Sequence, residues 1–164
     1  MRFASLFCAL LFAAFPLNAA QSRQLFHIER NKNANIVRYD VNLDSKGNID
    51  SKNPVSGYWI MLAKDARREE LSSFEKRAYG FSVTQDKGKK LFIMKINPFK
   101  DRDIKVYRLK NKYLAEMNVN GKPAYLFKVY INAKDTLLLP KVKFIDLCGK
   151  DKKTGKDMCE RIKK

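Results

Sequence analysis

The sequence predicts a mainly β protein, a single antiparallel β-sandwich or barrel of about nine strands with one short helix. Three observations predict this class. Apolar and polar residues alternate with a period of two in several segments, turn-prone stretches such as SKGN, QDKGKK and NPFKDRD separate those segments, and only one segment has helical spacing. Neither an internal repeat nor a Pro/Gly/Ser-rich linker divides the chain, so we expect residues 21–164 to form a single β-rich domain.

The N-terminal residues predict export. Arg2 precedes an apolar run from Phe3 to Leu17, and small residues follow at positions 18–20. A transmembrane helix needs about 20 apolar residues, and this run is shorter and contains Pro16. We therefore interpret residues 1–20 as a cleaved signal peptide, and we expect a periplasmic or secreted protein whose mature chain has no transmembrane segment.

The clearest strand pattern is the segment KPAYLFKVYI, which starts at residue 122. Tyr125, Phe127, Val129 and Ile131 share one face of this segment. Asn120-Gly121 joins it to a second alternating segment, residues 113–119, and this dipeptide is a strong signal for a hairpin. The remaining predicted strands are 25–29, 36–43, 58–62, 80–84, 91–96, 104–109 and 142–147.

One helix is predicted in the segment EELSSFEKRAYG. Leu71, Phe74 and Ala78 fall at helical spacing, and Gly80 stands where a helix can end. We expect a short helix that packs on or across the sheet.

The cysteine count predicts one disulfide. Cys8 lies in the predicted signal peptide, which leaves Cys148 and Cys159 as an even pair in the mature chain. In an oxidising compartment such a pair forms a disulfide. A zinc site is the alternative, but the pair is not a CxxC motif and no His lies near it, so we expect no metal.

The segment NLDSKGNIDSKN resembles a calcium-binding loop only in part. Asp44 and Gly47 have the expected offsets, but Lys46 occupies a ligand position, and Asn53 stands where a bidentate Glu is needed. We interpret the segment as a polar loop between strands. The sequence also has no Gly-rich phosphate loop, so we expect no cofactor.

Catalysis is the minority hypothesis for this chain. A Ser-His-Asp or Cys-His arrangement would require His27, the only histidine, and a lone strand histidine is more often structural. The alternative function is therefore an envelope hydrolase that uses His27 or a pair of carboxylates. The carboxylate candidates are Glu29, Asp40, Glu75 and Asp146.

The segment FHIERNKNANIVRYD is the first candidate for a binding site. Its Asn residues tolerate left-handed backbone and explain a bend between two strands, but they do not explain Arg30, whose guanidinium suits a carboxylate, a phosphate or a backbone carbonyl. Nearby aromatic residues are able to line a cleft, although core packing is their usual role. The predicted ligand-binding residues are Arg30, Asn31, Asn33, Asn35, Tyr39, Tyr58 and Trp59.

The charge predicts anionic partners. The chain has 34 Lys and Arg against 17 Asp and Glu, a net charge of +17, which attracts polyanions such as anionic lipid, lipopolysaccharide or a cell-wall polymer. Nucleic acid is an unlikely partner outside the cell. Because the lysines are dispersed, solvation is the alternative explanation. A basic stripe would form if the strand with Lys105 neighboured the strand with Lys141 and Lys143.

Five segments in the same order carry a resemblance to a known family: FHIERNKNANIVRYD, NPVSGYWI, AYGF, NGKPAYL and PKVKFIDLCGKDKKTG. They resemble the small secreted bacterial proteins described as domain of unknown function 4833. The resemblance implies one domain and an envelope location, and it implies no reaction, cofactor, ligand or disulfide. The leading hypothesis is a secreted or periplasmic non-catalytic binding module of unknown ligand, with an anionic envelope component as the candidate.

Overall fold

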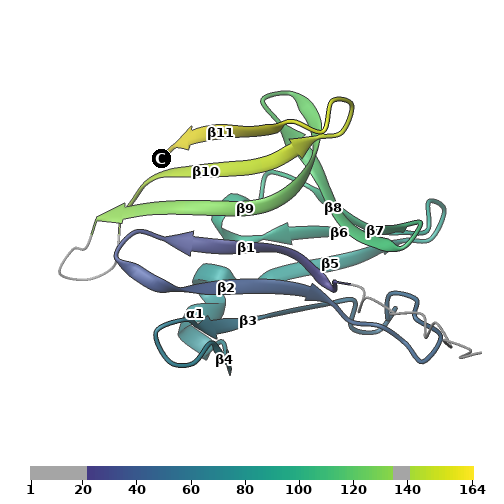
Figure 1. Cartoon of the computed structure of the whole chain (residues 1–164), viewed down its shortest axis with the longest axis horizontal. Helices are drawn as coiled ribbons and strands as arrows, with labels where there is room; N and C mark the ends of the chain where they lie inside the picture. The colour runs from purple at the N-terminus through teal and green to yellow at the C-terminus, as the bar shows by residue number, and fades with distance from the viewer. Residues whose placement is uncertain (1–21, 135–140) are drawn as a thin grey trace, which may run out of the picture.

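The computed structural model describes residues 22–134 and 141–164. The predicted signal peptide lies outside these residues. The described chain is mainly β, as predicted, with eleven strands and one α-helix (Figure 1). The strands are β1 (Gln24–Arg30), β2 (Asn33–Val41), β3 (Val55–Met61), β4 (Arg67–Glu70), β5 (Phe81–Asp86), β6 (Leu91–Ile96), β7 (Ile104–Leu109), β8 (Lys112–Val119), β9 (Lys122–Lys134), β10 (Lys141–Asp151) and β11 (Asp157–Lys163). The helices are α1 (Ser73–Tyr79) and the short 3-10 turn η1 (Asn97–Phe99).

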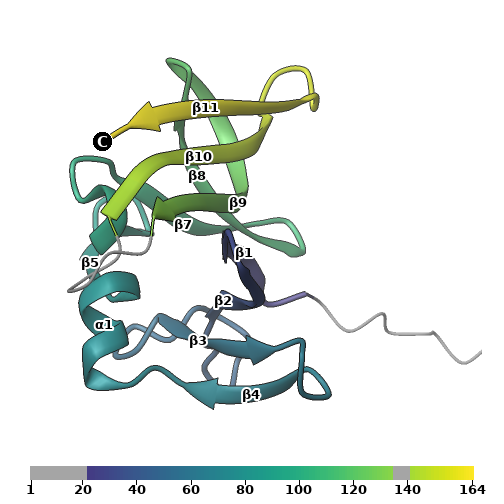
Figure 2. The ribbon, with the colours of Figure 1, turned by 90° about the vertical axis from the view of Figure 1, so that its left-hand side faces the viewer.

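The long strand β9 connects two groups of strands. On one edge it pairs with β10, which in turn pairs with β11. On the other edge its first residues pair with β8, and its middle residues, Lys128–Ile131, pair with β1. The strands β1 to β4 therefore extend from β9 in one direction, and β8 to β5 extend from it in another (Figures 1 and 2). The result is a curled, sandwich-like half-barrel whose terminal strands, β4 and β5, do not pair with each other.

One strand pair differs from the antiparallel arrangement that the sequence predicts. β1 and β9 are parallel, with His27 opposite Lys128 and Arg30 opposite Ile131, whereas all other strand pairs are antiparallel. A parallel pair needs a long connection between its strands, and here the connection contains the intervening strands β2 to β8. Local alternation in a sequence carries no information about such a distant pairing.

The side chain of Asn31 extends the pairing of β1 and β9 by one step. Its Nδ2 donates to the carbonyl of Ala133 at 2.9 Å, and its Oδ1 accepts from the amide of Ala133 at 2.8 Å. An Asn amide is able to donate and accept at the same time, as a backbone peptide does. Asn31 therefore replaces a backbone partner at the end of β1.

The sequence did not predict β4 and β11. β4 reads RREE and contains no apolar residue, and β11 reads DMCERIK, in which four of the seven residues are charged. Both strands lie at the edge of the sheet and pair on one side only. An exposed edge strand does not need an apolar face, so it has little of the alternation that identifies a strand in a sequence.

The core lies between the two groups of strands. Alternate residues of each strand point inward, as in β6, where Phe92, Met94 and Ile96 are buried. These side chains belong to one continuous hydrophobic cluster. The largest fully buried members include Tyr39, Phe26, Phe99, Ile28, Met94, Ile96, Ile104, Ile145 and Leu147.

The helix α1 is held in place by polar contacts rather than by the apolar face that the sequence predicts. Ser72 caps its N-terminus in a capping box with Glu75, and Glu75 also accepts a hydrogen bond from Trp59 Nε1 at 2.9 Å. Phe74, expected on the packed face, is 60% exposed, and the only buried residue of the helix is Tyr79. The prediction was correct for the position of the helix and wrong for its buried face, because a helix of two turns is too short for a stable apolar stripe.

The predicted disulfide between Cys148 and Cys159 is confirmed. The two residues lie directly opposite each other on β10 and β11, with their Cα atoms 4.1 Å apart. The bond holds the C-terminal strand on β10. A disulfide is typical of proteins in an oxidising compartment.

Asn31→Ala is predicted to destabilise the fold. The substitution removes two hydrogen bonds that join β1 to β9, at roughly 1 kcal/mol each, so the free energy of unfolding should fall by about 1–3 kcal/mol. Urea denaturation measures this change. The control is Asn33→Ala, because the exposed Asn33 side chain accepts only from the amide of Asn35. Equal stability of Asn31→Ala and the wild type would contradict the role given to Asn31.

Candidate functional site

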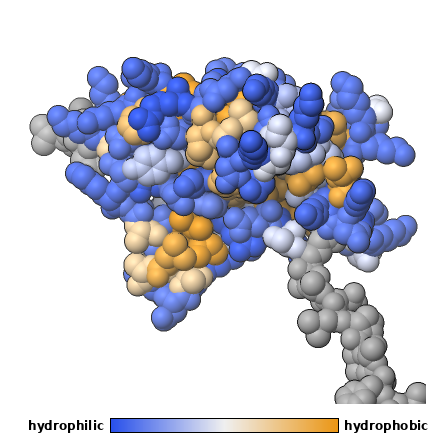
Figure 3. Space-filling view, turned by 45° about the horizontal axis from the view of Figure 1, so that its top comes forward, coloured by the Kyte–Doolittle hydropathy of each residue, from blue (hydrophilic) through white to orange (hydrophobic). Residues whose placement is uncertain are grey.

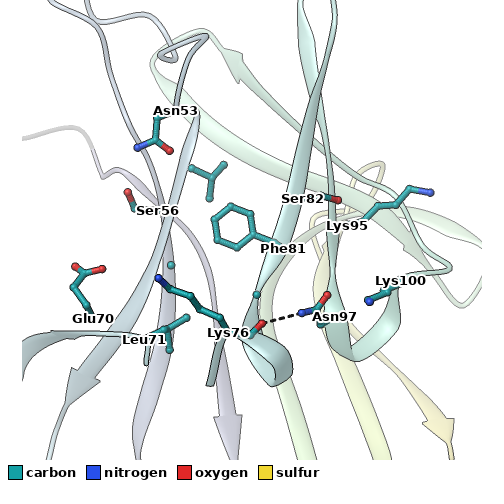
Figure 4. Close-up of a pocket in the computed structure, with 13 residues that line it drawn as sticks. Asn53, Ser56, Glu70, Leu71, Lys76, Phe81, Ser82, Lys95, Asn97 and Lys100 are labelled. Atoms are coloured by element: carbon teal, nitrogen blue, oxygen red, sulfur yellow. Dashed lines mark hydrogen bonds between the residues drawn. The ribbon is translucent and has the colours of Figure 1, made fainter. Parts of the chain in front are cut away.

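A cleft of about 660 Å³ opens where the half-barrel does not close. Its walls come from the start of β3, from β5 and β6, and from α1 and η1 (Figure 4). The pairing of β3 with β4 begins only at Tyr58, so residues 55–57 have one unpaired edge, and β5 also pairs on one side only. The cleft thus lies between two strand edges that the fold leaves free.

Three lysines line this cleft, which we call the lysine cleft. They are Lys76 of α1, Lys95 of β6 and Lys100, which follows η1. Glu70 is the only carboxylate among the lining residues that the structure describes. The neutral polar lining residues are Asn53, Ser56, Ser82 and Asn97, and the apolar ones include Val55, Leu71 and Phe81. The lining is therefore apolar in part, polar at its rim, and positively charged.

Two of the three lysines have no carboxylate partner in the described part of the chain. Lys76 and Lys100 form no ion pair there, whereas Lys95 Nζ lies 3.2 Å from Asp103 Oδ1. Figure 4 shows Lys76 extending from one side of the cleft and Lys95 and Lys100 on the other. The lysines of the lining therefore come from both sides of Phe81, and the side chain of Lys95 ends away from that ring (Figure 4).

Phe81 lies in the centre of the lysine cleft (Figure 4). Its ring contacts the buried ring of Tyr39 edge to face, with the ring centroids 5.7 Å apart. Opposite stands Gly57, where a Cβ would lie 3.0 Å from Phe81 and 3.1 Å from Tyr39. The glycine thus leaves space for two aromatic rings beside the edge of β3.

The turn after α1 fixes the lysine-bearing wall of the cleft. Asn97 Nδ2 donates to the carbonyls of Lys76 and Arg77 at 2.9 and 3.0 Å, which joins η1 to the end of α1. Gly80 ends the helix, and a Cβ there would lie 2.1 Å from the carbonyl of Lys76. Lys76 and Lys100 therefore project from two turns that are bonded to each other.

A second cleft, of about 600 Å³, adjoins the first at Lys95. It lies over the outer face of β6, β7 and β8. We call it the mixed-charge cleft, because both cations and carboxylates line it. Its cations are Lys95, Arg102 and Lys105, and its carboxylates are Asp101, Asp103, Glu116 and Glu160. Arg102 forms a two-pronged ion pair with Glu160, with its Nη1 2.7 Å from Oε2 and its Nη2 2.5 Å from Oε1.

Glu116 is the one charged residue that is buried in the described part of the chain. It accepts hydrogen bonds from Tyr107 Oη and from Lys152 Nζ, the latter at 2.8 Å. Burial opposes ionisation of Glu116, but the bonds from Lys152 and Tyr107 outweigh it and hold the pKa of Glu116 below its usual value. Burial and the contact with Glu116 raise the pKa of Tyr107. This cluster fixes the loop after β10 on the outer face of β8.

The Asn residues of the predicted binding site act within the fold. Asn31 bonds to Ala133, Asn33 accepts from the amide of Asn35, and Asn35 accepts from the amide of Ala63 at 3.3 Å. Arg30 ends β1, is half-buried, and makes a contact of its own within the chain.

The three predicted aromatic residues do not lie on one surface. Tyr39 is fully buried against Phe26 and donates to the carbonyl of Tyr79, and Trp59 is buried beside Tyr79. Tyr58 faces the other side of β3, where it donates to Asp40 at 2.6 Å and Arg68 covers its ring. The seven predicted residues line neither of the two clefts. A ligand-binding role for them stays a prediction.

The residues proposed for the alternative hydrolase each have a partner of their own. His27 contacts Gln24 and Glu29, and Glu29 also pairs with Lys128. Arg38 donates two hydrogen bonds to Asp40, Ser72 and Trp59 donate to Glu75, and Arg161 donates to Asp146. Among these contacts, no two of the four carboxylates share a partner.

The segment with calcium-like spacing forms a self-contained turn. Asp44 Oδ1 accepts from the amides of Lys46 and Asn48, at 2.8 and 2.9 Å, and Leu43 pairs with Ile49 across the turn. These bonds, that from Asn48 above all, lower the pKa of Asp44. The carboxylate therefore caps its own loop.

The predicted basic stripe does not form, because β7 and β10 are not neighbours: β7 lies between β6 and β8, and β10 lies between β9 and β11. Figure 3 shows hydrophilic residues over most of one face, with separate smaller hydrophobic patches. None of the helices that the structure describes is long and apolar enough to cross a membrane.

The fold and its clefts define a class of small β proteins with a curled, half-closed sheet and a basic cleft at the opening. The chain belongs to the family described as domain of unknown function (DUF4833), which matches residues 26–161. No curated protein and no solved structure matches the chain. The family match confirms the resemblance that the sequence segments carry.

Acid should weaken the contact between Arg102 and Glu160. The bonds from Arg102 lower the pKa of Glu160, so this carboxylate contributes stability above its unfolded-state pKa, and the contribution is lost as the pH falls through the lower folded-state pKa. Glu160→Gln should therefore be less stable than the wild type at pH 7, and the difference should shrink between pH values of about 5 and 2.

Urea denaturation over a pH series measures the difference between Glu160→Gln and the wild type. The control is Thr84→Ala, which keeps every carboxylate and should change stability by the same amount at each pH. A difference for Glu160→Gln that stayed constant from neutral to acid pH would contradict the ion pair.

Proposed function

We propose that this chain is an exported, non-catalytic binding protein whose ligand is an anionic component of the cell envelope, held in the lysine cleft. The observation that carries the proposal is that Lys76, Lys95 and Lys100 line one cleft together with Phe81, with Glu70 as the only carboxylate among the lining residues that the structure describes. The disulfide supports an oxidising compartment, and the N-terminal segment supports export.

The chemistry of the cleft suits a ligand that carries negative charge on a partly apolar body. Ammonium groups bind phosphate or carboxylate groups by charge-assisted hydrogen bonds. The exposed part of Phe81 offers an aromatic surface on which the apolar face of a sugar ring can pack, and the side chains of Asn53, Ser56 and Ser82 offer hydrogen bonds to hydroxyl groups. The volume of about 660 Å³ lies in the range of small-molecule sites.

The arrangement supports binding more than catalysis. A general acid or base needs a group that titrates near the working pH and that reaches the substrate. The described lining of the lysine cleft contains no histidine, and its one carboxylate, Glu70, is 72% exposed and pairs with Arg68. The cleft therefore offers charge and hydrogen bonds for holding a ligand.

The test compares two double variants that lose the same charge. Lys76→Ala/Lys100→Ala removes two lysines of the cleft, and the matched control, Lys112→Ala/Lys163→Ala, removes two exposed lysines that line neither cleft. Binding is measured by isothermal titration calorimetry with polygalacturonate, and by co-sedimentation with vesicles of phosphatidylglycerol and of phosphatidylcholine, each over a salt series.

The cleft variant should bind polygalacturonate at least tenfold more weakly than the control, because it loses two charge-assisted contacts of about 1 kcal/mol or more each. Binding by the wild type should weaken as salt rises, since exposed charges more than about 8 Å apart are largely screened at physiological ionic strength. Equal loss of binding in both double variants would mean that overall charge, and not the cleft, attracts the polymer.

A further inference from the structure

The two clefts adjoin each other, and together we call them the groove. Lys95 lines both, so the lysine cleft and the mixed-charge cleft meet at its side chain. Lys95 stands on the outer face of β6, opposite Ser82 of β5, and its ammonium group reaches Asp103 at the start of β7. The groove therefore runs from the edge of β3 past β5 and across the outer face of β6, β7 and β8.

The groove is longer than a single sugar or lipid headgroup. Neighbouring strands are about 4.8 Å apart, so the part that crosses from β5 to β8 alone spans three such distances, roughly 14 Å. The gap between β5 and β3 adds to this length. A small ligand would fill one end of the groove and leave the other end empty.

The two ends differ in charge. In the lysine cleft, Lys76 and Lys100 form no ion pair with any carboxylate of residues 22–134 and 141–164. In the mixed-charge cleft, three carboxylates are each paired with a cation: Asp103 with Lys95, Glu160 with Arg102, and Glu116 with Lys152. Paired groups of both signs offer donors and acceptors with little net charge, which suits the hydroxyl and amide groups of a sugar.

The groove does not suit insertion into a bilayer. The large apolar side chains that are exposed in the described part of the chain are Leu62, Phe74 and Leu109, and none of them lines either cleft. Shallow insertion into a membrane requires apolar side chains that enter the acyl region next to the basic ones.

From the adjoining positions of the two clefts, and from the length and charge of the groove, we infer that the ligand is an acidic polysaccharide chain of several sugar units. An anionic group of the chain occupies the lysine cleft, and the neighbouring units lie across the mixed-charge cleft. This inference rests on the proposed function, since it specifies the ligand of the lysine cleft and extends the site to residues that the proposed function does not use.

The test uses oligogalacturonates of increasing length, from the dimer to the dodecamer, and three single variants. Lys100→Ala changes only the lysine cleft, Lys105→Ala changes only the mixed-charge cleft, and Lys112→Ala, the control, changes neither. All three lysines are exposed and form no ion pair in the described part of the chain. Thermal unfolding of each variant verifies that it folds.

The affinity of the wild type should rise at least tenfold with chain length and then become constant once the oligomer spans both clefts. Lys100→Ala should weaken the binding of every oligomer, whereas Lys105→Ala should weaken only the longer ones, by about threefold or more, and Lys112→Ala should bind as the wild type does.

Three results would overturn the inference in different ways. Oligomers that bind with an affinity independent of length, with Lys105→Ala unchanged and Lys100→Ala weakened, would leave the lysine cleft as a site for a small anionic group and reject the chain. Absence of binding to any oligomer, together with binding to phosphatidylglycerol vesicles that Lys100→Ala weakens, would keep the proposed function and make lipid the ligand. Absence of binding to both probes would reject the proposed function and the inference together.

Discussion

The pairing of β9 is the constraint on which the rest of the structure depends. One edge of this strand carries β10 along most of its length, and the other carries first β8 and then β1. Since two strands share one edge, the strands that continue from them diverge, and the two groups enclose the core between them. Asn31 strengthens this division, because its amide continues the pairing of β1 with β9 beyond the end of the strand.

The lysine cleft follows from the same constraint. Two groups of strands that diverge from β9 have terminal strands that do not meet, here β4 and β5, and β4 also leaves the start of β3 unpaired. The helix α1 spans this opening because it connects β4 to β5, and it brings Lys76 to the cleft (Figure 2). The site is thus the unclosed side of the half-barrel, lined by the free edges of β3 and β5 and by residues of β6, α1 and η1.

The net charge of +17 has two parts with different meanings. On the outer faces many cations have partners, such as Arg38 with Asp40, Arg102 with Glu160 and Arg161 with Asp146, and these pairs serve the fold. In the lysine cleft, by contrast, Lys76 and Lys100 form no ion pair with a carboxylate that the structure describes. Exposed ion pairs contribute little to stability. The positive charge of the lysine cleft is therefore more informative about a binding partner than the net charge of the whole chain is.

Much of the fold was predictable from the sequence, because each strand that borders the core needs alternating apolar residues. The hairpin at Asn120-Gly121, the position of α1 and the disulfide were predictable for equally local reasons. The parallel pair β1–β9 and the edge strands β4 and β11 were not, since a distant pairing and an exposed edge leave no periodic signal.

The candidate site was not predictable either: Lys76, Lys95 and Lys100 lie on separate elements among many dispersed lysines, and only the unclosed sheet brings them together. The conspicuous segment after Phe26 owes its Asn residues in large part to turns and to the contact with Ala133.

The central claim is that the unclosed side of the half-barrel is the binding surface, and backbone amide chemical shifts measured by NMR test it most directly. On titration of the labelled protein with an oligogalacturonate, the largest shift changes should occur at the residues around Lys76, Ser82, Lys95 and Lys100. The amides of residues 30–35, on the turn between β1 and β2, should remain unchanged. Shift changes concentrated at residues 30–35, with none along β5, α1 and η1, would contradict the account.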